Sequence, residues 1–356
     1  MDTPYSGLPA RAFWRSAVAE ADPSHLRDIC RPRFAIAPGL PIATAGSCFA
    51  QNLRAPFRAA GLDVLDAEPA PRGLSGAEAA RFGYGLFSAR YGNIYTVRQF
   101  CQLLADARDQ AIDRGAVWRR GGRYFDALRP SVEPGGLASA DEVLAHRRHH
   151  LGRVQAMVKS AGLVVFTLGL TETWVDAGSG RVYPTAPGVM ADPPEGTAIR
   201  FHSHTVSEVV ADLALLMAAL RAANPAVRLL LTVSPVPLTA TASDQHVLVA
   251  TTYSKSTLRA VAGDVAAGNP LVDYFPSYEI ITAPPFAGQF FAANKRSVLA
   301  EGVDHVMRMF FAGQAGRFGA EPEAPAATAG LVVESDDGED GVVCEEALLN
   351  AFAPKV

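Results

Sequence analysis

Four short apolar segments, each followed by a helical pattern, constrain the fold of this chain most strongly. They read "LPIATAG", "LVVFTLG", "VRLLLTVSPV" and "LVDYFPSYEII". Apolar runs without polar alternation are typical of strands that are covered on both faces. Strands that alternate with helices favour right-handed crossovers and a mostly parallel sheet. We therefore predict an α/β fold with three layers, in which helices cover both faces of the sheet.

The segments between these strands have the spacing of amphipathic helices. Ser139 is a candidate N-cap for one helix, and Thr205 with Glu208 forms a capping box for another. The predicted helices span residues 48–61, 76–111 with a break at Tyr91-Gly92-Asn93, 139–162, 205–225, 245–267 and 297–313. The stretch "AVWRRGGRYFDALRP" has a Gly-Gly turn between residues of strand character, which predicts an inserted hairpin.

The end of the chain differs in composition from the rest. With 356 residues of which 49% are hydrophobic, the chain can bury a large core, and we assign residues 1–319 to one domain. Residues 320–330 are rich in proline and alanine, which predicts a linker. Residues 331–356 are expected to form an acidic, hairpin-like extension that could dock a protein partner.

Charge and cysteine content limit the classes of function. The net charge is −4, so no global basic field exists to hold nucleic acid or an anionic membrane. The four cysteines have neither metal-site spacing nor a paired motif, which is typical of reduced thiols in the cytoplasm. No stretch is long and apolar enough for a spanning helix, and the N-terminus lacks a signal-peptide pattern. We expect a cytoplasmic protein that acts on a small polar substrate or a protein partner.

Ser47 and Cys48 are rival nucleophiles in the stretch "ATAGSCFA". Ser47 follows the first strand and opens a helix, where backbone N–H groups can stabilise the oxyanion that a nucleophile generates. The simpler alternative is that Ser47 only caps the helix. Cys48 would be activated by the same helix N-terminus, although a small buried residue is the commoner role for a cysteine there.

Several ordered blocks of the chain resemble those of a known family. They are "ATAGSCFAQNL", "FSARYGNIYTVRQF", "FTLGLTETWV", "LTVSPVPLTATAS" and "DYFPSYEIIT". They are similar to the GSCFA family, which is grouped with the SGNH/GDSL-type hydrolases. The resemblance implies a flavodoxin-like sheet, a serine nucleophile after the first strand, and catalysis that needs neither a metal nor an organic cofactor.

The resemblance also implies where the oxyanion is held. Ser47 matches the nucleophile of the first block, and Gly92 with Asn93 is the best match for the second block. The third block, usually Gly-x-Asn-Asp, corresponds to Gly169-Leu170-Thr171-Glu172. Here the sequence departs from the pattern, because Thr171 cannot present the amide donor of asparagine. Asn93 could supply that donor, or Thr171 and Glu172 could shape a pocket without touching an oxyanion.

The general base is the larger departure from the SGNH pattern. Such hydrolases usually end with Asp-x-x-His, where this chain has Asn294 and Ser297. The only Asp-x-x-His motif, Asp22 to His25, lies ahead of the serine. The remaining histidines are therefore considered by position, and each has the alternative of a local hydrogen bond.

His246 is the first choice for the base, because it follows a buried strand on the side of the sheet that carries functional loops. His202, in a segment expected to be a loop before a helix, is the second, together with His204. Asp273 and Glu279 leave the final strand and could orient a histidine or bind a substrate hydroxyl. Their alternative is to bond locally at the strand end.

Three hypotheses follow from these residues. The first is a serine-dependent ester hydrolase or acyltransferase that acts on a small-molecule ester or an O-acylated carbohydrate. The second is a catalytically inactive relative that binds a glycan or a protein in the same cleft. The third is thiol chemistry at Cys48, which would be lost in Cys48→Ser and largely spared in Ser47→Ala.

Overall fold

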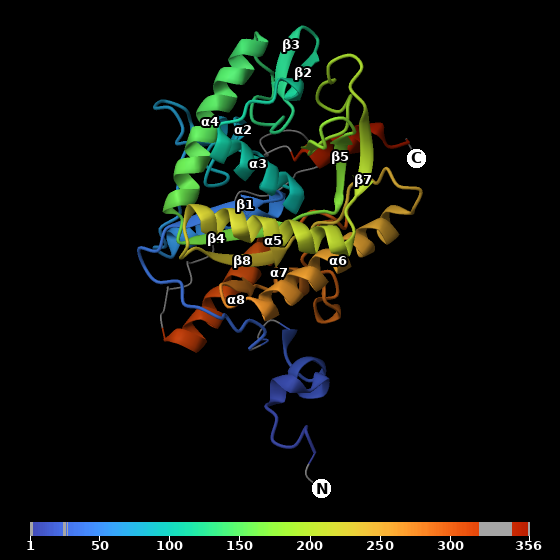
Figure 1. Cartoon of the computed structure of the whole chain (residues 1–356). Helices are drawn as coiled ribbons and strands as arrows, with labels where there is room; N and C mark the ends of the chain where they lie inside the picture. Colours follow the sequence, from blue (N-terminus) through green and yellow to red (C-terminus); the bar gives the residue numbers. More distant parts are fainter. Residues whose placement is uncertain (1–2, 24–25, 27, 320–343, 355–356) are drawn as a thin grey trace.

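A parallel four-stranded sheet forms the centre of the molecule (Figure 1). The computed structural model describes residues 3–23, 26, 28–319 and 344–354. The sheet has the order β1 (Ile42–Gly46), β4 (Leu163–Leu168), β8 (Arg228–Val233) and β9 (Val272–Tyr274). A parallel bridge between Ile42 and Val64 extends it beyond β1. The predicted mostly parallel sheet is confirmed.

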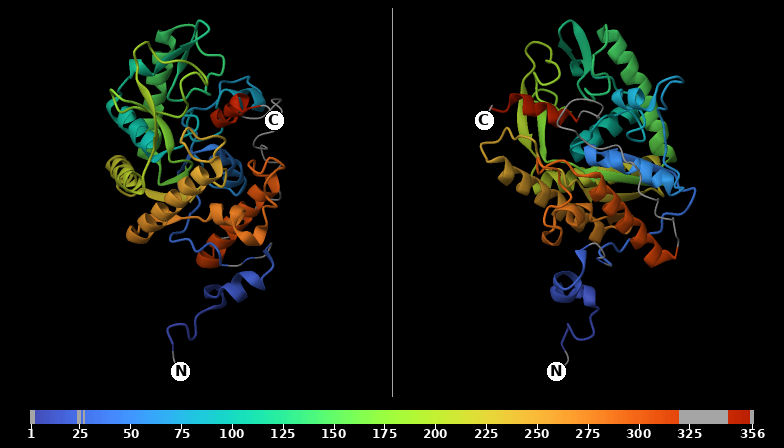
Figure 2. Two further views of the ribbon diagram at one scale, coloured as in Figure 1. Left: turned by 90° about the vertical axis from the view of Figure 1, so that its right-hand side faces the viewer. Right: turned by 180° about the vertical axis from the view of Figure 1, so that it is seen from behind.

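Successive residues of β1, β4 and β8 enter two separate hydrophobic cores, one on each face. In β4, for example, Val164 and Phe166 belong to one core, whereas Leu163 and Val165 belong to the other. The first core is covered by α3 (Val97–Asp109), α4 (Ala140–Ser160), α5 (Val206–Ala223) and α6 (Val247–Gly268). The second is covered by α1 (Arg54–Ala59), α7 (Ser277–Thr282) and α8 (Ala300–Phe318) (Figure 2). Helices thus cover both faces of the sheet, as predicted.

Two small antiparallel sheets are added to this framework. The predicted hairpin is confirmed as β2 (Val117–Arg120) and β3 (Arg123–Asp126), joined by two glycines with positive φ. The second sheet was not predicted and has the order β6 (Val182–Tyr183), β5 (Glu172–Asp176) and β7 (Ile199–Ser203). It places His202 on a strand, where the sequence indicated a loop.

Three helix and strand predictions need correction. The segment 271–281 is a strand only as far as Tyr274; Pro276 cannot donate to a ladder, and α7 begins directly after it. The helix expected at 48–61 is a 3-10 turn (Cys48–Asn52) followed by the short α1. Between α2 (Gly76–Arg81) and α3 lies a loop of residues 82–96, which is longer than the expected break.

Of the acidic, hairpin-like extension expected at 331–356, residues 331–343 lie outside the described residues, as does the 320–330 linker, and the described residues 344–354 contain no strand. The described end of the chain forms a 3-10 helix, Glu345–Phe352. Among the described helices, none combines the length and the apolar character needed to cross a bilayer.

Candidate active site

Ser47 lies at the carboxyl end of β1, where β1 and β4 approach each other closely. Gly46 has a φ of 140°, and a Cβ atom there would lie 2.5 Å from the Thr167 carbonyl oxygen. The Ser47 N–H donates to that carbonyl over 3.2 Å. After β1 the chain first pairs through Val64 on one side of β1, and it then returns to pair through β4 on the other side. Ser47 therefore occupies the point where strand order reverses, which is where ligands bind in open α/β sheets.

The Ser47 hydroxyl makes no hydrogen bond in the described part of the molecule. Ser47 is 3% exposed, and its Oγ has no hydrogen-bond partner among the described residues. It does not cap the following 3-10 helix, so the capping alternative is wrong. A buried hydroxyl without a partner costs free energy, so such a group calls for a functional explanation.

Gly169 brings the loop after β4 against the serine. A Cβ atom on Gly169 would lie 2.9 Å from Ser47 Cβ and 3.1 Å from the Tyr95 carbonyl oxygen. The Gly169 N–H donates to Tyr95 O over 3.1 Å. Only glycine fits this contact. The structure thus brings together Ser47 of the first block and Gly169 of the third block.

Asn93, the candidate amide donor, binds the C-terminal end of the chain. Its Nδ2 donates to Glu345 Oε2 over 2.6 Å, and its Oδ1 accepts from Gln51 Nε2 over 3.0 Å. The Tyr95 hydroxyl donates to the same Glu345 oxygen over 2.8 Å. Gly92, with a φ of 67°, lies beside them, and a Cβ there would be 3.7 Å from Glu345 Oε1. A carboxylate oxygen therefore already accepts the hydrogen bonds that the Asn93 amide and the Tyr95 hydroxyl donate.

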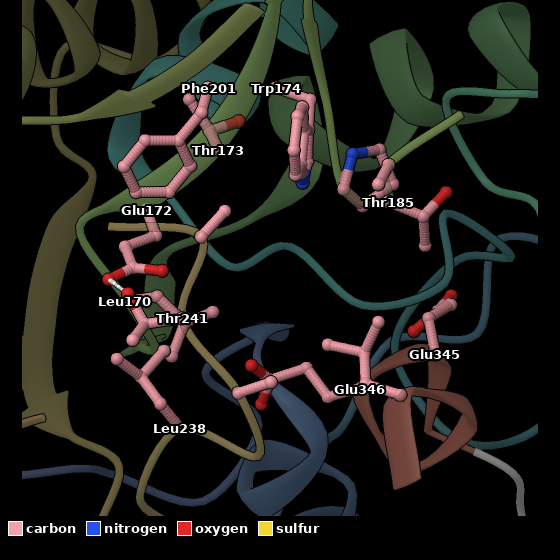
Figure 3. A pocket seen from close by; sticks show the side chains of 15 residues that line it. Leu170, Glu172, Thr173, Trp174, Thr185, Phe201, Leu238, Thr241, Glu345 and Glu346 are labelled. Carbon is pink, nitrogen blue, oxygen red and sulfur yellow. Dashed lines mark hydrogen bonds between the residues drawn. The ribbon is translucent and has the colours of Figure 1, made fainter. Parts of the chain in front are cut away.

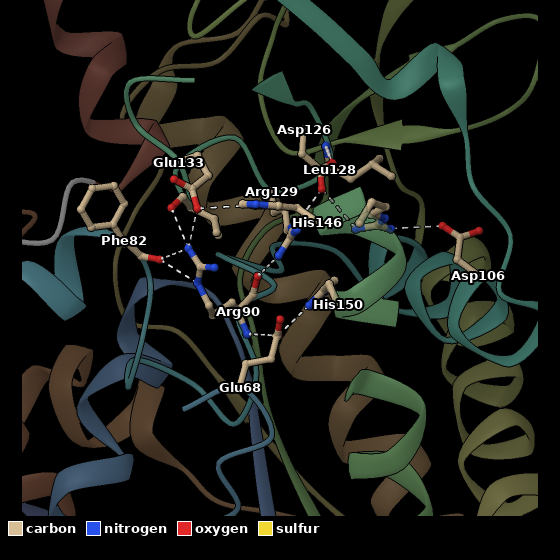
Figure 4. Close-up of polar contacts among 12 residues, drawn as sticks. Glu68, Phe82, Arg90, Asp106, Asp126, Leu128, Arg129, Glu133, His146 and His150 are labelled. Atoms are coloured by element: carbon tan, nitrogen blue, oxygen red, sulfur yellow. Dashed lines mark hydrogen bonds and ion pairs between the residues drawn. The ribbon is translucent and has the colours of Figure 1, made fainter. Parts of the chain in front are cut away.

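A network of buried ion pairs supports the loop that carries Asn93 and Tyr95 (Figure 4). The Arg90 guanidinium donates to the Phe82 carbonyl and to Glu133, and its backbone N–H donates to Glu68 over 2.7 Å. Arg129 donates to the Arg90 carbonyl over 3.1 Å and pairs with Asp126 over 2.7 Å. These contacts fix the backbone just before Gly92 from both sides.

Lys255 has a buried amine that contacts the loop after β4, which we call the serine loop because its Gly169 lies against Ser47. It lies on α6, is 1% exposed, and donates from Nζ to the Gly169 carbonyl over 2.7 Å. Burial lowers the pKa of Lys255 to about 8, while attraction to Glu346 and Cys48 opposes that shift. An amine with such a pKa can lose its proton near neutral pH.

Thr171 and Glu172 have different environments beyond Gly169. The Thr171 N–H donates to Ser254 Oγ over 2.9 Å, and its hydroxyl lies 3.1 Å from Ser203 Oγ. Glu172 accepts from Thr241 over 2.7 Å, and burial raises the pKa of its carboxyl.

Glu172 also helps to line a cavity of about 140 Å³ (Figure 3). The labelled walls include the aromatic side chains Trp174 and Phe201, together with Glu345 and Glu346 from the end of the chain. Of the two alternatives for this block, the pocket-shaping one agrees with the position of Glu172. The structure leaves Thr171 bonded to its neighbours.

The structure does not bring the predicted histidines to Ser47. His246 is exposed at the N-cap of α6, where its Nδ1 accepts from the Leu248 N–H over 3.2 Å. His202 bonds through Nε2 to Glu208 over 2.9 Å. Each histidine thus makes the local hydrogen bond that was the alternative to its role as general base.

His202, His204 and Glu208 form a group that could hold a metal ion, because their ligand atoms lie within 4.8 Å of one another. The other Glu208 oxygen completes the capping box with Thr205 at the start of α5. This capping bond and the bond to His202 account for both Glu208 oxygens in the described structure.

The two predicted carboxylates also have local partners. Asp273 accepts from the Arg33 N–H over 2.6 Å and from the Tyr274 N–H over 2.8 Å, so it holds the N-terminal arm against β9. Glu279 pairs with Arg259 and accepts from the Tyr274 hydroxyl. Asn294 and Ser297, which replace the usual Asp and His, bond to each other over 2.9 Å.

Sequence reasoning missed Tyr95 and Glu345. It allowed Lys255 to act as a base only if burial lowered the pKa of the amine, which the sequence cannot show. Tyr95 was already inside a quoted block, two residues after Asn93, and that spacing was an available signal. Glu345 belongs to a stretch that reads as a solvated acidic surface, so no local pattern could have placed it in a cleft.

Comparison with known proteins gives one family match. A model of the GSCFA family matches residues 41–310. A search of curated proteins finds no match. Among solved structures, a carbohydrate esterase family 3 protein from Talaromyces cellulolyticus is similar at 12% identity and a TM-score of 0.34, over 78% of this chain and 94% of that chain.

Proposed function

The chain belongs to the GSCFA family, and from that premise we propose that it is a serine-dependent ester hydrolase or acyltransferase of the SGNH type. One observation carries the proposal: the Ser47 hydroxyl is buried at the switch point of the sheet without a hydrogen-bond partner in the described residues. The order of the Val64 bridge, β1, β4, β8 and β9 is the flavodoxin-like order 2-1-3-4-5, which supports the SGNH comparison.

In this proposal Ser47 Oγ attacks the carbonyl carbon of the ester. The carbonyl oxygen becomes an oxyanion, which accepts from Asn93; the Ser47 N–H can join it only by leaving the Thr167 carbonyl. The tetrahedral intermediate then expels the alcohol, and an acyl-enzyme remains on Ser47. Water releases the acid in a hydrolase, whereas a second hydroxyl takes the acyl group in an acyltransferase.

Lys255 is our candidate for the proton acceptor, in place of a histidine. Its amine bonds to the Gly169 carbonyl, and Gly169 contacts Ser47. In the neutral form it could take the serine proton and later return it to the leaving alcohol. His246 remains an alternative base that would have to leave its bond to the Leu248 N–H.

An O-acylated carbohydrate is our candidate substrate. The cavity beside the serine loop has aromatic walls, Trp174 and Phe201, and a carboxyl group, Glu172, that can accept from sugar hydroxyls. Aromatic rings next to hydrogen-bonding groups suit the flat and polar surfaces of a sugar. The four cysteines are all free thiols, which supports a reducing compartment such as the cytoplasm.

A glycan- or protein-binding module without catalysis is the second candidate. It is favoured by the sealed position of Ser47 and by the absence of any histidine bonded to it in the described residues. The cavity would then be the binding site, and the serine would contribute nothing to affinity.

Labelling with a fluorophosphonate probe separates these candidates. We expect wild-type protein to be labelled at Ser47, with the site located by mass spectrometry, and Ser47→Ala to lose labelling completely. Cys48→Ser is the matched neighbour and should keep it. Absence of labelling in folded wild-type protein and in variants that open the cleft would reject the hydrolase in favour of the binding module.

A further inference from the structure

The described end of the chain, which we call the C-terminal segment (Cys344–Phe352), is inserted next to the serine. Cys344 and Glu345 are 0% and 1% exposed, although this stretch carries acidic residues that would be well solvated on a surface. Hydrogen bonding with the Cys48 thiol raises the pKa of Cys344, and Cys48 directly follows Ser47. The segment therefore contacts the cleft itself.

Two donors converge on one oxygen of this segment. Asn93 Nδ2 and the Tyr95 hydroxyl lie 2.6 and 2.8 Å from Glu345 Oε2. Two preorganised donors on a single negative oxygen are what an oxyanion hole provides. The second oxygen, Oε1, is buried without a hydrogen-bond partner in the described residues. Glu345 thus resembles a bound carboxylate ligand more than a member of a completed structural network.

Further contacts hold the segment in place. Glu346 pairs with Arg296 over 3.1 Å, and the Tyr95 hydroxyl lies 3.0 Å from Cys344 Sγ. Since Ser47 Oγ has no solvent access in this arrangement, no ester could reach it without movement of a covering group. The C-terminal segment contacts both Cys48, next to the serine, and Asn93, the amide donor.

We propose that Asn93 and Tyr95 form a carboxylate subsite, and that Glu345 of the same chain is its resident ligand. The subsite accepts the carbonyl oxygen of a substrate, or the carboxylate of the released acid, only after Glu345 leaves. Tyr95 is thereby assigned as a second oxyanion donor beside Asn93. This inference rests on the proposed function for its catalytic meaning, but occupation of the subsite by Glu345 can be tested independently.

Full-length Glu345→Ala tests the proposal, with Asn350→Ala on the exposed part of the same segment as the matched control. We expect fluorophosphonate labelling of Ser47 to accelerate at least about tenfold in Glu345→Ala, because a competing occupant has been removed. Asn350→Ala should label at the wild-type rate. In the Glu345→Ala background, Tyr95→Phe should slow labelling again. An unchanged or slower rate in folded Glu345→Ala would overturn the proposal.

Hydrogen exchange separates failure of this inference from failure of the proposed function. Glu345→Ala should exchange faster than wild type at the amides of the C-terminal segment, and added acetate should accelerate exchange in the wild type by competing for the subsite. Faster exchange without labelling of Ser47 in any variant would refute the hydrolase and keep the subsite. Unchanged exchange in both experiments would refute the subsite.

Discussion

Two buried polar regions lie on either side of Gly92, and they differ in how their hydrogen bonds are completed. In the ion-pair network of Figure 4, Arg90 and Arg129 are each bonded to both a carboxylate and a backbone carbonyl. In the serine cleft, Ser47 Oγ and Glu345 Oε1 are buried without hydrogen-bond partners in the described residues. The network uses its polar groups to hold the backbone, whereas the cleft keeps groups that a ligand can complete.

The two regions are connected through one loop. Arg90 belongs to the network, and Asn93 and Tyr95, a few residues later, belong to the cleft. Buried arginines that are bonded on both sides, as Arg90 and Arg129 are, can hold the neighbouring donors at the geometry that catalysis requires. Disturbing the cleft should therefore change reactivity, and disturbing the network should change stability.

Removal of the Lys255 amine should have the largest effect on the rate at which Ser47 is labelled. This effect should be confined to reactivity. If Lys255 accepts the serine proton, labelling should rise with pH through about 8, because only the neutral amine is a base. Lys255→Met should lower the plateau rate by about 100-fold or more and remove this limb of the pH profile. The measurement is the labelling rate between pH 6 and 10 in the Glu345→Ala background.

The exposed Lys159, at the end of α4, provides the matched control. Lys159→Met should retain both the rate and the limb. A limb that persists in Lys255→Met would assign the base to another group, with His246→Ala as the next variant to measure.

Arg129→Ala tests the network side of the comparison. Arg129 is 4% exposed, so its removal takes the Arg129 donor from the Arg90 carbonyl and leaves Asp126 with only the longer ion pair to Arg147, at 3.8 Å. Breaking a buried pair in this way should lower the free energy of unfolding by about 3–5 kcal/mol. Chemical denaturation gives the value directly.

Arg108→Ala is the exposed counterpart, because the Arg108–Asp109 pair has a similar short distance, 2.6 Å against 2.7 Å for Arg129–Asp126, but lies on the surface. Its loss should lower the free energy of unfolding far less, because water screens both of these exposed side chains. Equal costs for Arg129→Ala and Arg108→Ala would show that the network adds no more than a surface ion pair.

Gly169→Ala should lower stability less than Arg129→Ala does, and it acts within the cleft. Its Cβ would lie 2.9 Å from Ser47 Cβ and 3.1 Å from the Tyr95 carbonyl oxygen. Overpacking of this kind should cost about 1–3 kcal/mol of the free energy of unfolding and should slow labelling as Ser47 is displaced.

Gly152→Ala, in α4, is the control, since the nearest atom to its Cβ would be 4.0 Å away. It should leave labelling unchanged and raise stability by up to about 1 kcal/mol, because alanine favours a helix over glycine. Labelling at the wild-type rate in Gly169→Ala would show that the serine loop tolerates displacement.

Local sequence signals predicted most of the framework. The apolar segments gave β1, β4 and β8, and the capping box at Thr205 marked the start of α5. They did not predict β5, β6 and β7, because two- to five-residue antiparallel strands with mixed burial have no distinct period. The family blocks directed attention to Ser47, Gly169 and Asn93, which the fold gathers around one cleft.

The sequence by itself determined the order of β1, β4, β8 and most of the helices around them. It thereby placed Ser47 after the first strand, since burial pattern and capping are properties of neighbouring residues. Tertiary structure alone decided the partners of that serine. Glu345 and Asn93 are 252 positions apart in the chain, and their hydrogen bond follows no local period. The tertiary structure also kept His246 on the surface and buried Lys255, because solvent access depends on how distant segments pack.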